Sequence, residues 1–105
     1  MAAITGTKQY QGELSGSTRL LELTAAVGSA SDTITLTLAS HGVNPSSTIS
    51  VLSATIESGQ GANFQSLHCT TSGLVITIAS LNGAGGAATT FGNIRLLVKV
   101  VEPTT

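Results

Sequence analysis

Residues 33–38 read TITLTL, and this stretch decides the fold class of the chain. Every second residue is apolar, so Ile34, Leu36 and Leu38 share one face of an extended segment while three threonines share the other. A period of two that is rich in β-branched residues is typical of a half-buried antiparallel strand. We therefore expect an all-β protein.

The same period recurs on both sides of this stretch. Further strands are expected over residues 19–23, 48–57, 65–70, 74–79 and 94–101. Turn-forming residues separate them at 41–45, 58–63 and 72–73, and the stretch 82–92 is too rich in glycine for a stable helix. Six or more short strands with such spacing predict an antiparallel β-sandwich or jelly roll. Elsewhere the residues expected on the inner faces are Leu21, Leu23, Leu67, Cys69, Ile94, Leu96, Val98 and Val100.

The strand expected over 48–57 changes phase within its length. Ile49 and Val51 share one parity, whereas Leu52, Ala54 and Ile56 share the other. Because one extra residue moves every later side chain to the opposite face, this change predicts a β-bulge or a bend between two sheets.

The domain organisation expected is an extended N-terminal arm over residues 1–16 and a single β-sandwich domain over residues 17–105. Glycines at 6, 12 and 16 interrupt every candidate element in the first segment. Two interpretations stay open for it: a disordered terminus, or an extended arm that orders against a neighbour.

The composition is unusual for a soluble domain. Ser, Thr, Gly and Ala make up about half of the chain, and only 9% of its residues are charged, against about 25% in ordinary domains. No charged residue lies between Asp32 and Glu57, or between Glu57 and Arg95. Charge normally protects the edges of sheets against unwanted pairing. Either hydroxyl groups suffice for solubility here, or a partner covers these edges in the working state.

Several function classes are disfavoured by the residues present. Four scattered basic residues and a net charge of −1 do not favour nucleic-acid binding. No apolar stretch approaches the roughly 18 residues of a membrane span. The first residues lack the basic and apolar regions of a signal peptide. A single cysteine excludes an intrachain disulfide and favours assembly in a reducing cytosol.

Catalytic and ligand-binding chemistry is not indicated either. His68 and Cys69 are adjacent on an expected strand and so face opposite sides, and His41 is expected in a turn. The dispersed carboxylates show no metal-ligand spacing, so we expect no metal and no cofactor. The glycine-rich loop lacks the Gly-Lys-Ser/Thr of a phosphate-binding loop. With no Trp and one Tyr, stacking platforms for sugars are scarce. We expect no enzymatic activity and no small-molecule substrate.

A short β-rich chain of this composition, ending in the strand NIRLLVKVV (residues 93–101), resembles the small jelly-roll decoration or cement proteins of tailed-phage heads. The resemblance covers roughly residues 17–102. It implies a structural protein on the capsid exterior of a virion, assembled in the host cytoplasm. Such a protein binds the major capsid protein as a homo-oligomer, a dimer or a trimer. The alternative is a tail, fibre or baseplate module that binds a receptor or carbohydrate.

Low charge and glycine content select the residues expected at the protein interface. They lie in the arm and in two loops: Ile4, Tyr10, Gly59, Gln60, Asn63, Asn82 and Phe91.

Overall fold

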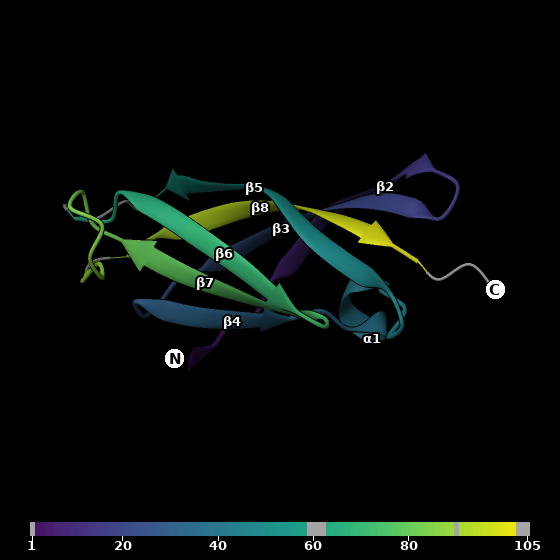
Figure 1. The fold of residues 1–105 in the computed structure, drawn as a ribbon, viewed down its shortest axis with the longest axis horizontal. Helices are drawn as coiled ribbons and strands as arrows, with labels where there is room; N and C mark the ends of the chain where they lie inside the picture. Colours follow the sequence, from purple (N-terminus) through teal and green to yellow (C-terminus); the bar gives the residue numbers. More distant parts are fainter. Residues whose placement is uncertain (1, 59–62, 90, 103–105) are drawn as a thin grey trace.

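The computed structural model describes residues 2–58, 63–89 and 91–102, which form a sandwich of two four-stranded β-sheets (Figure 1). Sheet A has the strand order β1 (Ala2–Ala3), β4 (Ser31–Thr35), β7 (Val75–Leu81) and β6 (Ser66–Ser72). Sheet B has the strand order β2 (Thr7–Ser15), β3 (Thr18–Ala26), β8 (Asn93–Val101) and β5 (Thr48–Ser58). Neighbouring strands are antiparallel, except that β1 pairs parallel with β4. The prediction of an all-β antiparallel sandwich is confirmed.

Two hairpins form within the sheets, and the other connections cross between them. The β2–β3 and β6–β7 hairpins each turn on a glycine, Gly16 with φ 55° and Gly73 with φ 58°. Each glycine is the first of the two turn residues, and the residue after it has a negative φ. This combination is the type II′ turn, whose twist matches that of the flanking strands.

The hydrophobic core lies between the two sheets. Its large buried side chains include Leu21, Leu23, Ile34, Leu36, Val43, Ile49, Phe64, Ile76, Ile78, Ile94, Leu96, Val98 and Val100. The strands predicted over 19–23 and 94–101 thus present the expected inner faces. Burial of each large apolar side chain contributes about 1.5–3 kcal/mol, so a slip of one residue in any of these strands would be costly.

The predicted bulge is present in β5. The pairing with β8 shifts between Val51 and Ser53, so that Leu52 is the extra residue. Leu52 is 53% exposed. Beyond the bulge, Ala54 and Ile56 pack against the core. The bulge therefore lets both apolar pairs of one strand face the interior.

The expected strand over 33–38 ends early. Ile34 and Leu36 are buried as predicted, but Leu38 is 63% exposed, so its prediction as an inward residue is wrong. The reason is a helix start: the Thr37 hydroxyl accepts a hydrogen bond from the Ser40 N–H and caps the short helix α1 (Leu38–His41). The chain therefore turns at Thr37 and carries Leu38 to the surface.

Most of residues 2–15, the segment expected as an arm, lies in strands that pair with the rest of the same chain. β2 pairs with β3 from Thr7 opposite Thr24 to Ser15 opposite Thr18. β1 pairs with β4, and the Ile4 N–H donates to the Thr33 carbonyl at 2.9 Å. Residue 16, the expected end of the arm, lies in the turn of a hairpin of sheet B.

Candidate protein interface

Three of the predicted contact residues, Asn63, Asn82 and Phe91, belong to the β5–β6 and β7–β8 connections, which lie at the left end of the sandwich in Figure 1. The Asn63 side chain bridges these loops, because its Nδ2 donates to the Thr89 hydroxyl at 2.6 Å and its Oδ1 accepts from the Thr89 N–H at 3.2 Å. The Phe91 ring packs edge-on against Phe64, with centroids 6.3 Å apart. Gly59 and Gln60 lie outside the described residues.

The Asn82 side chain organises its own loop. Its Oδ1 accepts hydrogen bonds from the N–H groups of Ala84, at 2.9 Å, and Gly86, at 3.0 Å. Asn63 and Phe91 thus connect different segments at this end of the sandwich, whereas Asn82 stabilises its own loop.

The other two predicted residues lie elsewhere. Ile4 follows β1 beside β4 and is partly buried against the core. Tyr10 lies on the edge strand β2 and is 59% exposed. The structure therefore does not gather Ile4 and Tyr10 with the loop residues into one surface.

A polar hollow of about 490 Å³ lies where sheet B meets the segment before β2. Arg95 forms part of its lining and pairs with two carboxylates: its Nη1 donates to Glu22 Oε1 at 2.7 Å, and its Nε donates to Glu57 Oε2. The hydrogen bond and charge of Arg95 lower the pKa of Glu57, and the hydrogen bond to Glu57 raises the pKa of Arg95. Because its charge is shared between these partners, Arg95 links the side chains of β3, β8 and β5 across the surface of sheet B.

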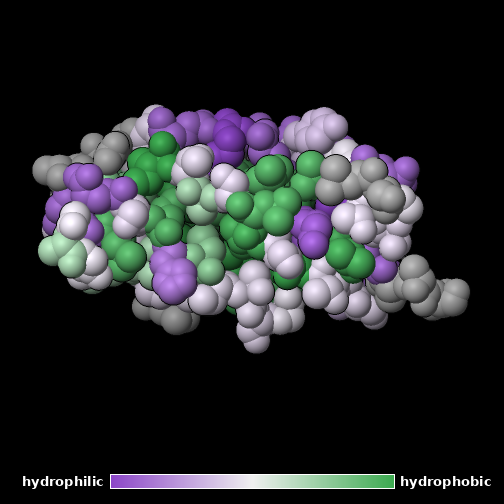
Figure 2. Space-filling view, turned by 45° about the horizontal axis from the view of Figure 1, so that its top comes forward, coloured by the Kyte–Doolittle hydropathy of each residue, from purple (hydrophilic) through white to green (hydrophobic). Residues whose placement is uncertain are grey.

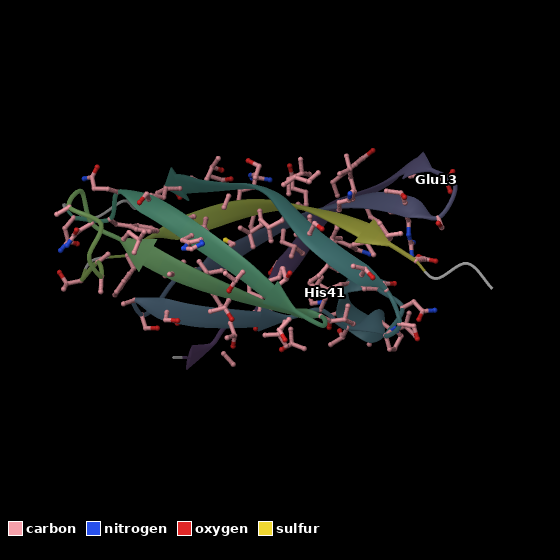
Figure 3. All side chains as sticks on the ribbon, in the orientation of Figure 1. Glu13 and His41 are labelled. Atoms are coloured by element: carbon pink, nitrogen blue, oxygen red, sulfur yellow. The ribbon has the colours of Figure 1, made fainter. Side chains whose placement is uncertain are left out.

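The two histidines have different environments. His41 is 4% exposed; its Nδ1 accepts from the Thr37 N–H at 3.0 Å, and its Nε2 lies 2.6 Å from the Gly6 carbonyl oxygen, to which it donates. His68 is exposed, whereas the neighbouring Cys69 is partly buried against the core. Figure 3 places Glu13 on the projecting β2–β3 hairpin, away from His41. Sequence reasoning missed the burial of His41, since no local pattern indicates its partner.

Burial also governs the Cys69 thiol. Desolvation raises the pKa of Cys69, so the thiol is protonated and poorly nucleophilic at neutral pH.

Within the part of the chain that the structure describes, no group of three His, Cys, Asp or Glu residues is placed to hold a metal ion. No helix among the described residues is long and apolar enough to span a bilayer.

The four edge strands differ in how they are protected. β1 has only two residues. β2 carries Lys8 and Glu13 and has two register shifts, and β5 carries Glu57 and also has two register shifts. β6 has seven residues, SLHCTTS, with no Lys, Arg, Asp, Glu or Pro and a continuous register against β7. Because charge, proline, bulges and shortness are the features that block strand addition, β6 is the unprotected edge among the described strands.

Partly exposed apolar side chains border this edge. We call them the β5–β6 seam; they are Val51, Leu52, Ala54 and Ile56 of β5, with Leu67 and Cys69 of β6. β5 and β6 contact each other where the two sheets meet at this side of the sandwich. Figure 2 shows hydrophobic residues along the middle of this side, between more hydrophilic margins. Apolar surface next to an unprotected strand edge is a typical protein-binding surface.

The sequence carried one signal for this surface, the absence of charge between Glu57 and Arg95. It could not show that β6 is an edge strand, because strand order depends on pairing between distant segments.

Comparison with known protein families, curated proteins and solved structures found no match for this chain.

Proposed function

We propose that this chain is a structural, non-catalytic protein of a phage virion that forms a homo-oligomer, decorates the outside of the head and binds the major capsid protein. The observation that carries the proposal is the unprotected β6 edge beside the β5–β6 seam. A monomer with such an edge is exposed to uncontrolled strand addition, and coverage by another protein surface removes that exposure. A structural role is also consistent with the environments of Arg95, His41 and Cys69, which lie in different parts of the fold and are each paired or partly buried.

The mechanism of stabilisation is binding linkage. A protein that binds the assembled shell and not its separated subunits stabilises the shell by RT ln(1 + [L]/Kd) per site. At a free concentration of 100 times Kd this term is about 2.7 kcal/mol for each site. Many copies on one head therefore add up to a large resistance against internal pressure.

The test is co-sedimentation with heads and tails purified from the phage whose genome carries the gene. Saturable binding to heads, with a rise in the temperature at which heads release their DNA, supports the proposal. Binding to tails alone supports the tail-module alternative and overturns decoration of the head. Binding to neither particle, or a gene that lies outside any phage genome, also overturns the proposal.

One observation favours the alternative, a tail or fibre module that binds carbohydrate. The polar hollow is lined by hydroxyl and amide groups that match sugar hydroxyls, including Thr7, Gln9, Thr24, Ser58 and Asn93. Among the described lining residues none is aromatic, so they offer no stacking platform of the kind that strengthens sugar binding. Titration with host surface polysaccharide tests this alternative directly, because binding in the hollow would shift the NMR signals of the backbone amides around Arg95.

A further inference from the structure

We propose that β6 pairs antiparallel with β6 of a second copy of this chain, so that the two A sheets join into one continuous sheet across a two-fold axis at Cys69. The inference assigns the β6 edge to the contact between two copies, so that other faces of the dimer are left to contact the major capsid protein, and it rests on the proposed function for its role on a shell. Its test uses the isolated protein without a shell, so failure of this inference can be distinguished from failure of the proposed function.

The β6–β7 ladder determines which backbone groups are available. Ser72 and Val75 flank a two-residue turn and therefore form a hydrogen-bonded pair. Hydrogen-bonded pairs alternate along an antiparallel ladder. The N–H and C=O groups of Leu67, Cys69 and Thr71 accordingly point away from β7 toward the open edge.

A second copy offers the same groups in reverse order. An axis through Cys69 sets Cys69 opposite its own copy and Leu67 opposite Thr71 of the second chain. Each N–H then meets a carbonyl, as an isologous two-fold interface requires. The parity also matches, because side chains that face inward in one copy lie next to side chains that face inward in the other.

Charge supports a second copy as the occupant. Two approaching copies of an edge that carries charges of one sign would repel each other. β6 carries no Lys, Arg, Asp or Glu, and neither does the chain from residue 58 to residue 94. The other long edges are interrupted, since β2 and β5 each have two register shifts. Among the described edges, β6 is the one that is uninterrupted and neutral toward itself.

The same arrangement accounts for the seam. β5 is the edge of sheet B on the side where β6 is the edge of sheet A. Joining two copies at β6 therefore brings the β5 edges toward each other. Val51, Ala54 and Ile56, which are half-buried in the single chain, would then lie inside a double sandwich. The dimer removes apolar surface from water as well as satisfying backbone groups.

The first test is the oligomeric state measured by sedimentation equilibrium and light scattering. We expect a dimer, twice the 10.5 kDa chain mass. Thr71→Lys places a charge on the open edge at an exposed position and should give a monomer with unchanged circular dichroism. Gln9→Lys adds the same charge to the exposed edge strand β2 and should remain dimeric. A wild-type monomer at high concentration, or a Thr71→Lys dimer, overturns the inference.

The second test fixes the register and does not depend on the fold of Thr71→Lys. Cα atoms of a hydrogen-bonded antiparallel pair lie about 5.5 Å apart, within disulfide range. Prolonged treatment with diamide should therefore oxidise two Cys69 thiols, slowly because burial raises their pKa, to an interchain disulfide seen on a non-reducing gel. The control is Cys69→Ser combined with Thr71→Cys, which moves the thiol two residues along the same edge and away from its own copy. Equal cross-linking of both proteins would overturn an axis at Cys69.

Discussion

Replacing His41 by Leu tests whether the buried imidazole holds the first residues of the chain against α1. The ring nitrogens bridge two distant segments, since Nδ1 accepts from the Thr37 N–H and Nε2 donates to the Gly6 carbonyl. Gly6 is itself buried, so water cannot replace the lost donor. Leu fills similar space and makes neither hydrogen bond, which isolates the polar contribution.

The magnitude follows from these two bonds. A buried carbonyl left without a donor costs about 1–3 kcal/mol, and loss of the second bond costs about 0.5–1.5 kcal/mol. We expect the free energy of unfolding to fall by about 1.5–4.5 kcal/mol, a large part of the 5–15 kcal/mol typical of a domain. The Tm should fall by at least about 6 °C, because 1 kcal/mol corresponds to about 4–8 °C at this size.

Urea unfolding followed by circular dichroism measures this change. The chain offers a matched control, because His68 is exposed on β6 and His68→Leu should change the free energy by no more than about 0.5 kcal/mol. His41→Gln keeps an amide donor that reaches toward Gly6, and its stability should lie between those of the His41→Leu and wild-type proteins. A His41→Leu protein as stable as the His68→Leu protein would refute the reasoning.

Three further perturbations test other features of the fold. Deleting Leu52 removes the bulge and forces one half of β5 to turn its apolar residues outward, so the free energy of unfolding should fall by several kcal/mol. The variant Leu52→Ser keeps the extra residue at an exposed position and should cost less than about 1 kcal/mol; equal losses of stability for the two variants in thermal unfolding would contradict the bulge. Because Arg95 lowers the pKa of Glu57 in the folded protein, this carboxylate adds stability above its ordinary pKa of 4.5 and loses it as the pH falls through the lowered value. Arg95→Gln should therefore flatten the dependence of Tm on pH in that acidic range, and an unchanged profile would rule out the pairing as its source. Because burial raises the pKa of Cys69, iodoacetamide should label the folded chain at pH 8 far more slowly than the urea-unfolded chain, as mass spectrometry would show; equal rates would mean that the thiol is not buried.

The candidate interface was only partly accessible to prediction. Low charge and glycine content selected Asn63, Asn82 and Phe91, but the structure gives these side chains hydrogen bonds and a ring contact within the fold. The uncharged stretch from residue 58 to residue 94 contains β6 and so pointed to the part of the chain with the unprotected edge. Its significance depends on β6 being an edge, which no local pattern states.

Sequence alone determined the features that depend on near neighbours. Alternation of apolar residues predicted the strands from β3 onward and most of their inner faces, although not β1 or β2, and the parity change between Val51 and Leu52 located the bulge in β5. These follow from strand geometry, in which each side chain's direction depends only on its position along the strand.

Tertiary structure alone decided which strands are edges, that Leu38 lies outside, and that His41 is buried against Gly6, 35 residues away in the chain. Each of these depends on which distant segments pair, and that choice minimises the free energy of the whole core at once. A local sequence pattern therefore determines which side chains share one face of a strand, whereas the assembled sheets determine which strand edges and side chains remain exposed.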